Sequence, residues 1–545
     1  MRAANLFVRC LENEGIDYVF GLPGEENLDL VDALLDSESI RFITTRHEQG
    51  AAFMADVYGR LTGRPGVCLA TLGPGATNLI TGVADGNMDH APMVAIAGQA
   101  DTNRLHKESH QVLDLELMFE PITKYSTRLL TPNTIAEVVR KAFKLAQTEK
   151  TGATFIELPE NIAKMEVDAK PLQAKYPVQP EAASGRVERA AQLISEAKEP
   201  LILAGNGVIR AKAWQQLADF SKRLNIPVAN TFMAKGVVPF ARNPLALGSV
   251  GLQAKDYVNC GFDKADVIIC VGYDLVEYHP YLWHPTCDRT IIHVDSMPAE
   301  VDGYYPVEVG VVGDIKHSLL RLAELATPHQ GHRMRPLRDA IVEEMNHFRE
   351  EEGFPVKPQK LIWDLRTAME PEDIAVCDVG AHKMWMARMF RCEQPNTCLI
   401  SNGFASMGIA LPGALAAKLV HPDRKVVAVT GDAGFLMNVQ ELETAMRAQT
   451  PFVVLIWNDR GYGLIKWKQL SQFGRPAYVD FNNPDFITLA ESFGAKGYRV
   501  ERTADLLPTL KQALAEDTVT VIDCPVDYSE NLKLTNKLGE MVCPV

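Results

Sequence analysis

The 545-residue sequence predicts an α/β protein made of three doubly wound domains, each built on a parallel sheet. A chain of this length holds about three domains. Short apolar runs alternate along it with stretches of helical periodicity, a pattern typical of parallel strands joined by helices on both faces of a sheet. Several of these runs end at a glycine turn, which is where such sheets bind ligands.

The first predicted domain spans residues 1–175. Its expected strands are residues 18–20, 66–70 and 93–97, and each ends close to a glycine. Residues 170–184 are rich in Pro, Gln and Ala and show little periodicity, which predicts a linker.

The second predicted domain spans residues 185–330. Its expected strands are residues 201–204, 267–271 and 291–295. Residues 328–338 contain His, Arg and Pro and predict a second linker.

The third predicted domain spans residues 355–545. Its expected strands are residues 374–377, 426–429, 452–457 and 519–522. The first and third domains share a strand-rich layout punctuated by glycine, so we expect two similar halves.

Composition and charge exclude several classes of protein. The formal net charge of −14 is spread along the chain, which argues against nucleic acid and against membranes as partners. No apolar run reaches membrane-spanning length, and the first residues lack the apolar core of a secretion signal. The ten cysteines show no metal-binding spacing. We therefore expect a cytoplasmic protein with reduced thiols.

A glycine turn with an acid lies at the centre of the third domain. The apolar run 426–429 leads into residues 430–434 (TGDAG), and the next run ends at Asn458-Asp459. Glycines let backbone N–H groups approach phosphate oxygens, and Asp432 with Asp459 can hold a divalent ion that bridges them. The alternative is an ordinary turn at a strand end with solvated acids.

Residues 46–52 (RHEQGAA) contain a second candidate, because Glu48 is followed by the apolar residues 51–54. A carboxylate in a poorly solvated pocket can share a proton with a ring nitrogen of a ligand. The alternative is a glutamate at a helix N-terminus, stabilised there by the helix dipole. A zinc-binding HExxH motif is excluded, since residue 51 is alanine.

A glutamate of this kind with a distant glycine turn and acid is the two-part layout of thiamine diphosphate enzymes. The chain resembles the acetolactate synthase family nearly end to end, and most of all its shorter, flavin-independent catabolic branch. The likeness includes residues 20–24 (FGLPG), 73–78 (GPGATN), 400–403 (ISNG) and 526–529 (VDYS). The chain also resembles a bacterial group that includes 2-oxoglutarate decarboxylases.

The resemblance implies an enzyme that uses thiamine diphosphate and Mg²⁺ to decarboxylate a 2-oxo acid, pyruvate. The remaining fragment then adds to a second 2-oxo acid and gives 2-acetolactate and CO₂. The alternative is decarboxylation without ligation, as in a 2-oxoglutarate decarboxylase that gives succinic semialdehyde. The resemblance also implies a homodimer or homotetramer whose active sites are shared between chains.

The resemblance assigns roles to individual residues. Glu48 is implied to control the tautomer of the aminopyrimidine ring, and His110 and Gln111 to lie near the reacting carbon. The implied metal ligands are Asp432, Asp459 and the backbone carbonyl of Gly461. The implied cofactor-binding residues are Pro23, Gly24, Gly73, Asn78, Val379, Gly380, Ala381, His382, Ala405, Met407, Gly431, Ala433, Gly434, Tyr462, Gly463 and Leu464.

Four positions depart from the family pattern or bear on the substrate. Most thiamine enzymes have glycine in place of Ala433, whose methyl is compatible with a negative φ. Catabolic acetolactate synthases tend to have lysine in place of Glu26, so the charge near the substrate is reversed. Ile465 and Lys468 are predicted to share one helix face toward the substrate, where Lys468 can pair with a distal carboxylate. The alternative for Lys468 is a solvated surface lysine.

Two other classes of function are weighed against this one. A non-catalytic homologue is disfavoured by the intact Glu48 and by the two metal acids. A nucleotide-binding oxidoreductase would use the central domain, but residues 205–207 (GNG) are only a fragment of the GxGxxG pattern. Residues 273–278 (YDLVEY) resemble the flavin-free branch, so we expect no FAD.

Overall fold

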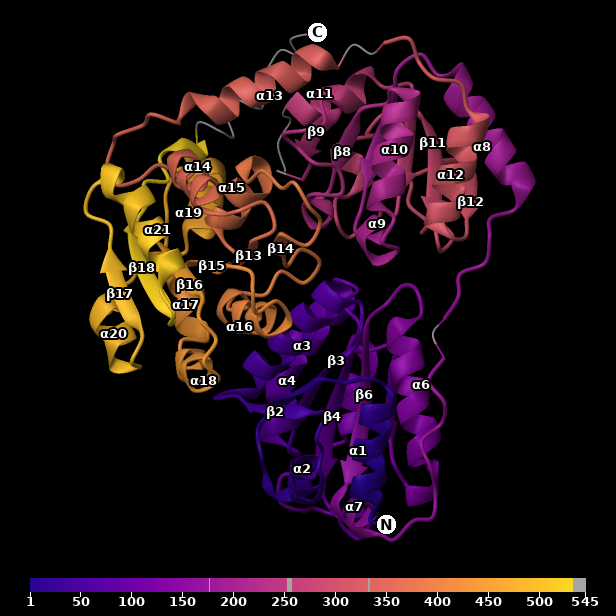
Figure 1. The fold of residues 1–545 in the computed structure, drawn as a ribbon, viewed down its shortest axis with the longest axis vertical. Helices are drawn as coiled ribbons and strands as arrows, with labels where there is room; N and C mark the ends of the chain where they lie inside the picture. Colours follow the sequence, from indigo (N-terminus) through magenta and orange to yellow (C-terminus); the bar gives the residue numbers. More distant parts are fainter. Residues whose placement is uncertain (176, 252–256, 332–333, 533–545) are drawn as a thin grey trace.

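The computed structural model describes residues 1–175, 177–251, 257–331 and 334–532. These residues form three parallel six-stranded sheets flanked by helices, which confirms the predicted α/β class and its doubly wound architecture (Figure 1). The N-terminal domain, drawn in indigo and purple, lies below the other two. The central and C-terminal domains lie side by side above it, and helix α13 (Arg335–His347) crosses from one to the other.

The sheet of the N-terminal domain has the strand order β2-β1-β3-β4-β6-β5. β3, β4 and β6 are buried at every residue, because helices cover both faces of the sheet. The strands are β1 (Tyr18–Gly21), β2 (Arg41–Thr44), β3 (Gly66–Ala70), β4 (Met93–Gln99), β5 (Tyr125–Arg128) and β6 (Ala153–Pro159). The helices are α1 (Ala3–Asn13), α2 (Leu28–Leu35), α3 (Glu48–Thr62), α4 (Pro74–Met88), α5 (Leu115–Phe119), α6 (Ile135–Gln147) and α7 (Glu160–Lys164).

The central sheet has the order β12-β11-β10-β7-β8-β9, so the direction of strand order reverses between β10 and β7. Such a reversal opens a crevice at the carboxyl ends of the two strands. The strands are β7 (Pro200–Ala204), β8 (Val228–Asn230), β9 (Ala246–Ser249), β10 (Val267–Val271), β11 (Thr290–Asp295) and β12 (Val307–Val312). The helices besides α13 are α8 (Ser184–Glu196), α9 (Gly207–Arg210), α10 (Trp214–Leu224), α11 (Tyr257–Lys264) and α12 (Ile315–Leu325).

The C-terminal sheet has the order β14-β13-β15-β16-β18-β17. Counted within the domain, this order equals that of the N-terminal sheet, so the predicted similarity of the two halves extends to their topology. The strands are β13 (Ile374–Cys377), β14 (Cys398–Ile400), β15 (Val426–Gly431), β16 (Val453–Asn458), β17 (Lys496–Arg499) and β18 (Thr520–Pro525). The helices are α14 (Pro358–Ala368), α15 (Ala381–Met389), α16 (Ala410–Val420), α17 (Asp432–Met437), α18 (Glu441–Arg447), α19 (Gly463–Phe473), α20 (Phe486–Ser492) and α21 (Leu506–Ala515).

The strands that apolar runs predicted lie in the interior of the three sheets. The runs 66–70 and 374–377 coincide with β3 and β13, and the other runs agree within a few residues. The strands that the sequence did not predict are the edge strands β2, β5, β9, β12, β14 and β17, together with the inner strands β6 and β8. Edge strands bury less of their surface, and β5 and β17 have no buried residue, so their sequences carry no continuous apolar run.

Two smaller expectations were wrong in part. The second linker ends earlier than residue 338, because α13 already starts at Arg335. Its Pro336 stands in the first turn of the helix, where proline is tolerated, so a proline there does not indicate a loop. The described cysteines other than Cys260 are free thiols, as expected, but Cys260 is disulfide-bonded.

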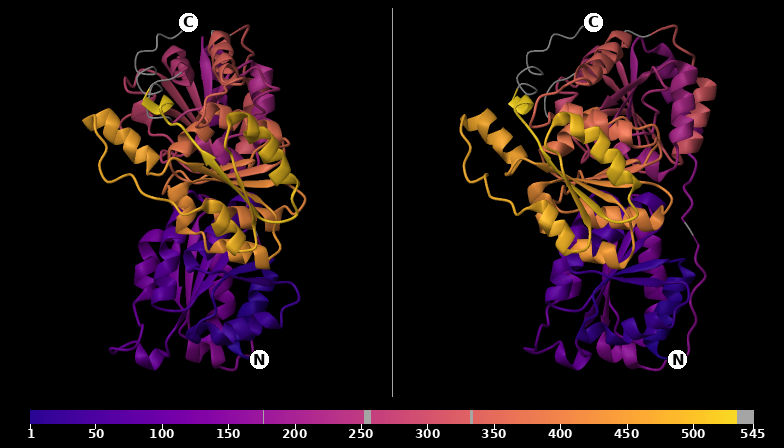
Figure 2. Two further views of the ribbon diagram at one scale, coloured as in Figure 1. Left: turned by 90° about the vertical axis from the view of Figure 1, so that its left-hand side faces the viewer. Right: turned by 60° about the vertical axis from the view of Figure 1, so that its left-hand side comes forward.

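One hydrophobic core joins the N-terminal sheet to the C-terminal sheet. α16 packs on α3 between the two sheets, and the views of Figure 2 show the C-terminal domain seated directly on the N-terminal domain. The two helices approach closely, since a Cβ at Gly413 of α16 would lie 2.9 Å from Cγ2 of Val57 in α3. Apolar packing therefore sets how the two sheets that carry the candidate site residues face each other.

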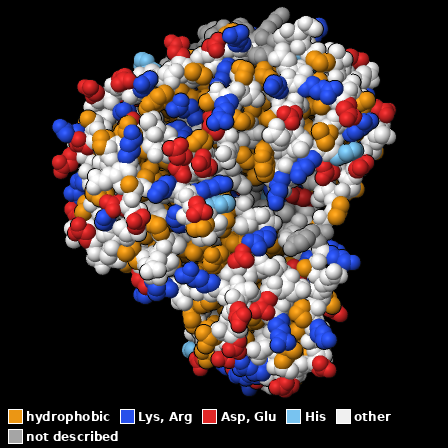
Figure 3. All heavy atoms as spheres, viewed as in Figure 1, with side chains coloured by type: hydrophobic (Ala, Val, Ile, Leu, Met, Phe, Trp, Pro, Cys, Tyr) orange, Lys and Arg blue, Asp and Glu red, His pale blue; other side chains and the backbone are white. Residues whose placement is uncertain are grey.

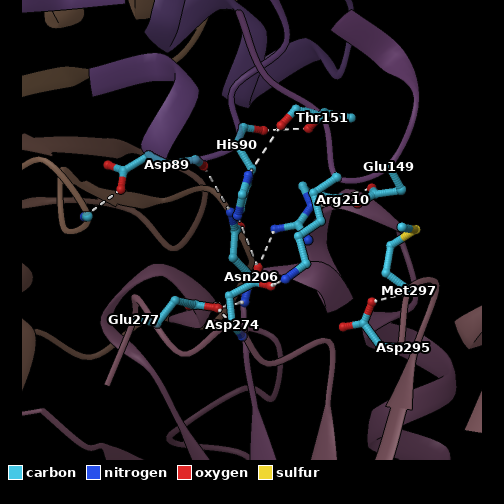
Figure 4. Close-up of polar contacts among 12 residues, drawn as sticks. Asp89, His90, Glu149, Thr151, Asn206, Arg210, Asp274, Glu277, Asp295 and Met297 are labelled. Atoms are coloured by element: carbon cyan, nitrogen blue, oxygen red, sulfur yellow. Dashed lines mark hydrogen bonds and ion pairs between the residues drawn. The ribbon is translucent and has the colours of Figure 1, made fainter. Parts of the chain in front are cut away.

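A buried charge cluster joins the N-terminal domain to the central domain (Figure 4). Arg210 lies between Glu149 and Asp274, at 3.1 Å and 3.2 Å, and Lys150 also pairs with Asp274. Burial alone would raise the pKa of Asp274, but the charge of Arg210 lowers it to about 2. Burial lowers the pKa of His90 to about 4, so this neighbour of Asp274 is a neutral imidazole. Two cations and two carboxylates thus pair across this junction.

The surface carries charges of both signs. On the face drawn in Figure 3, blue and red side chains are interspersed over all three domains. Among the described helices, we find none with both the length and the apolar character needed to cross a membrane.

Gly82→Ala should destabilise the protein. A Cβ at Gly82 in α4 would lie 2.5 Å from the Cβ of Ala52 in α3, which cannot rotate away. Helix propensity favours alanine by about 1 kcal/mol, but overpacking costs about 1–3 kcal/mol. We expect a lower midpoint of thermal unfolding. The control is Gly185→Ala in α8, which has no atom within 4 Å of the new Cβ and should not lower it. Equal shifts for the two variants would contradict a close α3–α4 contact.

Candidate functional site

Side chains at the carboxyl ends of the N-terminal strands gather around Glu48. Glu48 starts α3 and is 9% exposed. Its Oε2 accepts a hydrogen bond of 2.9 Å from Nδ2 of Asn78 in α4. A Cβ at Gly75 would lie 3.3 Å from Glu48 Oε1, so the start of α4 passes close to the carboxylate. The structure thus brings together two of the predicted residues, Glu48 and Asn78, and leaves Oε1 beside a glycine.

The turn after β1 belongs to the same cluster. Glu26 is buried, and its Oε2 accepts a 2.9 Å hydrogen bond from Oγ1 of Thr71, which follows β3. Gly24 lies against the same threonine, since a Cβ there would lie 2.4 Å from Thr71 Cβ. The neighbouring Pro23 is exposed. The Glu26 carboxylate is therefore held by a hydroxyl, which the sequence did not indicate.

His110 and Gln111 meet this cluster at Gly73. Both residues are exposed. Gly73 has a φ of +50°, and a Cβ there would lie 2.8 Å from the carbonyl oxygen of Gln111. Gln111 itself has a φ of +58°, a left-handed conformation that costs a residue other than glycine about 1–2 kcal/mol. Such strained residues concentrate at functional sites, so the backbone here is consistent with a role for Gln111.

A second cluster lies at the carboxyl ends of β15 and β16. Asp432 is buried at the start of α17, and its Oδ2 accepts hydrogen bonds of 2.7 Å from the Arg460 N–H and from Nδ2 of Asn483. Asp459 follows β16, and burial together with the neighbouring Asp432 raises its pKa to about 7. Burial also raises the pKa of Asp432. Two carboxylates that destabilise each other in this way indicate a place for a cation.

The predicted residues next to these acids fit the same place. Ala433 lies in α17 and has no positive φ, so its methyl group brings no backbone strain. Gly461 is tightly surrounded, because a Cβ there would lie 2.8 Å from the carbonyl oxygen of Val479. A Cβ at Gly463 would lie 2.6 Å from Oδ2 of Asp459. Both positions are therefore too closely surrounded for a side chain.

The turn after β13 is organised by Asp378. The buried carboxylate accepts hydrogen bonds from the N–H groups of Val379 (2.7 Å), Gly408 (2.8 Å) and Ala410 (3.2 Å). It also accepts one from Oγ1 of Thr430 at 3.3 Å. Burial raises its pKa to about 6, against the effect of these donors. Asp378 thus ties three strand-end segments together.

His382 faces the glycines of this cluster. The side chain is buried, and burial lowers its pKa to about 3, so the imidazole is neutral. Its Nε2 is buried and has no hydrogen-bond partner among the described residues. A Cβ added at Gly431 would lie 3.4 Å from the imidazole ring, and one added at Gly380 would lie 2.7 Å from it. The ring of His382 therefore lies against Gly380 and Gly431 and carries a polar atom that a bound group can satisfy. Ala381 is buried in the same turn, whereas Gly434 lies against Asp378.

Residues 401–408 carry Ala405 and Met407 and are anchored by the N-terminal domain. Asp85 of α4 accepts hydrogen bonds from Oγ of Ser401 at 2.7 Å and from the Ser406 N–H at 3.2 Å. Ala405 has a φ of +60°, and Met407 is half-buried. The strained backbone at Ala405 is held because both flanking segments are fixed by buried carboxylates.

The same anchor includes Arg60 of α3. Its guanidinium contacts Asp56 and Asp89 at 2.6 Å and Asp85 at 3.4 Å. Asp89 also accepts hydrogen bonds from the N–H groups of Asn402 (3.0 Å) and Gly403 (2.6 Å). One cation thus neutralises only part of the charge of three buried aspartates, and backbone N–H groups of residues 402–406 compensate the rest.

Helix α19, which starts shortly after Asp459, lies at the surface. No residue of α19 is buried, and Ile465 is 49% exposed. Leu464 packs partly against the core, whereas Lys468 is exposed and makes no ion pair within the described chain. The neighbouring Lys466 pairs with Asp480 at 2.8 Å. The predicted substrate roles of Ile465 and Lys468, and the cofactor role of the exposed Tyr462, stay predictions.

The sequence did not reveal several residues of the site. Asn483 donates to Asp432 and to Oδ1 of Asn458 at 3.0 Å, and its own Oδ1 is buried without a described partner. No motif spacing identifies Asn483, because α19 separates it from Asp459. Asp85 and Asp89 recur on one face of the same helix, so their spacing was a usable signal.

The crevice of the central sheet is filled by the protein. Glu277 accepts hydrogen bonds from the Asn206 N–H at 3.0 Å and from Oγ1 of Thr231, as Figure 4 shows in part. Burial raises the pKa of Glu277 to about 8. A Cβ at Gly205 would lie 2.7 Å from Glu277 Oε1, so the carboxylate lies directly on the GNG turn. The position that a nucleotide phosphate takes in similar sheets is therefore held by a side chain.

The residues present fit both expected groups. The described residues contain no cluster of three or more His, Cys, Asp or Glu side chains for a metal ion. Mg²⁺ that also binds phosphate needs only one or two carboxylates, which Asp432 and Asp459 supply. Nε2 of His382 has no partner among the described residues and is available to phosphate oxygens. The glycines at 380 and 431 have no side chain that would block them.

Models of three protein families match the chain in order. The thiamine pyrophosphate enzyme N-terminal TPP binding domain matches residues 1–118, the central domain matches 187–322, and the C-terminal TPP binding domain matches 378–524. The two outer matches contain the two clusters described above. The fold and the site thus define a thiamine pyrophosphate enzyme.

Individual relatives show to which family of thiamine pyrophosphate enzymes the chain belongs. The acetolactate synthase of Bacillus subtilis (strain 168) is 37% identical over 99% of this chain and 97% of its own length. The catabolic acetolactate synthase of Raoultella terrigena is 36% identical over 98% and 97%, and the acetolactate synthase isozyme 3 large subunit of Escherichia coli (strain K12) is 32% identical over 98% and 96%. The chain belongs to the thiamine diphosphate-dependent acetolactate synthase family, as predicted, and is an enzyme of the carboligase and decarboxylase type.

Asp432→Ala should remove Mg²⁺ and thiamine diphosphate together, because the ion and the diphosphate bind as one unit. We expect the dissociation constant of the cofactor, measured by calorimetry with Mg²⁺, to rise at least about 100-fold. The control is Asp423→Ala, an exposed carboxylate just before β15. Wild-type cofactor affinity in Asp432→Ala would show that the metal acids are misassigned.

Proposed function

We propose that the protein joins two molecules of pyruvate to form 2-acetolactate and CO₂, with thiamine diphosphate and Mg²⁺ as cofactors. The observation that carries this proposal is the similarity of nearly the whole chain to acetolactate synthases. When bound, thiamine diphosphate supplies a nucleophilic carbon that attacks a 2-oxo group and takes up the electrons left by CO₂. The roles proposed below belong to the protein's own side chains.

Glu48 is proposed as the group that exchanges a proton with the ring nitrogen of the aminopyrimidine. Its low exposure keeps water away, and the Asn78 amide at 2.9 Å orients Oε2. Oε1 lies beside Gly75, which has no side chain to block the approach of a ring nitrogen. A carboxylate that is fixed and poorly solvated can share a proton with that ring.

The C-terminal cluster is proposed to hold the diphosphate end. Asp432, Asp459 and the Gly461 carbonyl would bind Mg²⁺, and the mutual repulsion of the two acids, seen in the raised pKa of Asp459, favours a cation between them. His382 and the N–H groups of residues 379–381 and 431–434 would contact phosphate oxygens. The imidazole of His382 is neutral, so it would contact a phosphate oxygen through a hydrogen bond rather than through a charge.

Residues 405–407 are proposed to bind the aminopyrimidine from its other side. Backbone groups at Ala405 and Met407 would pair with the ring, and the Met407 side chain would keep the cofactor bent. The hydrogen bonds of Asp85 and Asp378 to the N–H groups of Ser406 and Gly408 fix this segment before any ligand arrives. Less ordering is then needed when the cofactor binds.

The substrate side is proposed to be formed by Gln111, His110 and the start of α19. The exposed amide of Gln111 can donate to a carboxylate or carbonyl oxygen of a 2-oxo acid. Glu26 is held by Thr71, so its charge contributes to the field at the site rather than a direct contact. Simple decarboxylation of 2-oxoglutarate is the second candidate, because Lys468 on α19 is a cation without an ion pair in the described chain.

Two copies of the chain are proposed to build each site. α19, which starts shortly after Asp459, has no buried residue, and Phe473 at its end and Tyr478 after it are among the most exposed large apolar side chains. A second copy that covers this surface would supply the apolar burial that a single chain does not. The assembly would be a dimer or a dimer of dimers.

We also propose that the central domain binds no flavin. The carboxylate of Glu277 already accepts the N–H of Asn206 at the strand end, where a dinucleotide would place its phosphates. A phosphate there would have to displace a buried side chain and approach Asp274 and Asp295, which lie nearby.

The proposed function is tested with one assay panel. Purified protein is loaded with thiamine diphosphate and Mg²⁺ and given pyruvate or 2-oxoglutarate, and acetolactate and succinic semialdehyde are both measured. Acetolactate from pyruvate is the expected product. Succinic semialdehyde from 2-oxoglutarate without acetolactate would replace the proposal by its alternative.

Glu48→Gln should nearly abolish turnover and leave the fold and cofactor affinity close to wild type. Loss of one catalytic proton transfer costs roughly 10²–10⁴-fold in rate. The measurement is kcat with saturating pyruvate, with the circular dichroism spectrum as a check of the fold. Activity within a few-fold of wild type would remove Glu48 from the mechanism.

The same variant tests the shared site. Coexpression of Glu48→Gln chains with Asp432→Ala chains gives hybrid dimers with one doubly altered and one intact site, if each site uses two chains. Random pairing should then restore about a quarter of wild-type activity. No recovery in demonstrated hybrids would place both residues of a site in one chain.

Lys468→Met tests how the substrate is chosen. If Lys468 pairs with a distal carboxylate, kcat/KM for 2-oxoglutarate should fall at least about tenfold, or roughly 1.4 kcal/mol, while that for pyruvate changes little. The control is Lys466→Met, whose lysine is already paired with Asp480. Equal effects on both substrates would refute the pairing and favour a plain acetolactate synthase.

A further inference from the structure

We propose that Glu441, on α18 of the C-terminal domain, is a positioning residue for Glu48. It binds the backbone of the turn from which Glu48 projects and so fixes where that carboxylate stands. The inference rests on the role proposed above for Glu48, and it adds a residue from a different domain to the machinery of that role.

Glu441 is fully buried and touches the turn directly. Its Oε1 accepts hydrogen bonds from the N–H groups of Arg46 (3.1 Å) and His47 (3.0 Å), and Oε2 lies 3.3 Å from the same Arg46 nitrogen. Oγ1 of Thr444 donates to Oε2 at 2.6 Å, which fixes the rotation of the carboxylate. The residue after His47 is Glu48, so both contacts lie within two residues of the proposed catalytic group.

These two N–H groups have no partner in regular structure. They lie between the end of β2 and the start of α3, where strand pairing has stopped and helical hydrogen bonding has not begun. The His47 side chain caps a different group, the N–H of Gln49. Without Glu441, the N–H groups of Arg46 and His47 would lose their side-chain acceptor, and the turn would no longer be attached to α18.

Close packing reinforces this contact. A Cβ at Gly50 would lie 2.8 Å from Glu441 Oε1, so the carboxylate rests on the first turn of α3. At the other end of α18, Arg447 donates to the carbonyl oxygen of Thr44 at the end of β2. α18 is thus attached at both ends to the segment that leads into Glu48, and Figure 1 shows it beside β2.

The attachment links the two clusters within one chain. α17 starts at Asp432 and α18 starts at Glu441, so a short segment runs from the metal acids to the turn before Glu48. A change in the position of α17 is therefore passed to Glu48 through a buried carboxyl group that accepts two backbone N–H groups. Packing of apolar side chains alone would not set the position of a single turn with this accuracy.

The test compares Glu441→Ala and Glu441→Gln with a control on the same helix, Glu443→Gln, which keeps an acceptor for Arg447. Hydrogen exchange is measured by mass spectrometry on peptides that cover residues 44–50, in protein without cofactor. Kinetics with pyruvate and the affinity for thiamine diphosphate are measured in parallel.

Glu441→Ala should raise exchange in residues 44–50 on the order of tenfold, with no change in peptides of β15 and β16. Its kcat should fall roughly 10-fold to 100-fold, with KM and cofactor affinity within about threefold of wild type. Glu441→Gln keeps one acceptor oxygen for the two N–H groups, so it should recover most of the protection and of kcat. Glu443→Gln should match the wild type in all three measurements.

Wild-type exchange or wild-type kcat in Glu441→Ala would overturn the proposal, and so would a uniform rise of exchange over the whole domain. If the alanine variant does not fold, the comparison of Glu441→Gln with Thr444→Val decides, since a positioning role predicts increased exchange confined to residues 44–50. Failure of the wild type to act on pyruvate would reject the proposed function, and the exchange data would still decide whether Glu441 holds the turn.

Discussion

The arrangement of the site depends on three buried aspartates and one arginine between the N-terminal and C-terminal domains. Arg60 cannot neutralise Asp56, Asp85 and Asp89 at once, and burial and the neighbouring acids raise the pKa of Asp85 well above its usual range. The remaining negative charge is compensated by a hydroxyl and N–H groups of residues 401–406, and Lys383 donates to the carbonyl oxygen of Ser401. Breaking such a network leaves uncompensated buried charge, which costs about 3–5 kcal/mol. The loop therefore adopts its strained form at Ala405 because the aspartates require its donors.

The sequence predicted the parts of the site that lie within one short segment. TGDAG after an apolar run, and Glu48 before an apolar stretch, are local patterns with a local physical reason. The structure places both at strand ends, but it adds Asp378, Asn483, Asp85 and Glu441, which act on segments tens to hundreds of residues away. Such contacts are set by how the three sheets pack, and no periodicity records them. Edge strands were missed for a related reason, since they bury too little to show an apolar run.

The central domain shows that topology alone does not determine a ligand. Its strand order reverses between β10 and β7, as in dinucleotide-binding sheets, and a glycine turn follows β7. Yet Glu277 accepts the N–H of Asn206 in that turn, and Arg210, Asp274 and Glu149 form ion pairs at the junction with the N-terminal domain. The crevice has become a structural joint that fixes the angle between domains. Function has to be argued from the groups at a site, because one fold carries many functions.

The two outer domains share one strand order, but the groups at their strand ends differ in polarity. The N-terminal strand ends present Glu48 in an apolar setting with a single amide partner, which suits proton sharing with a ring. The C-terminal strand ends present paired acids, glycines and an unpartnered imidazole nitrogen, which suits a cation and phosphates. A single cluster could not do both, since a divalent ion near Glu48 would lower the proton affinity of that carboxylate. Separate sheets allow each half its own electrostatic environment, and Glu441 and the Arg60 network supply the rigid connection that this separation requires.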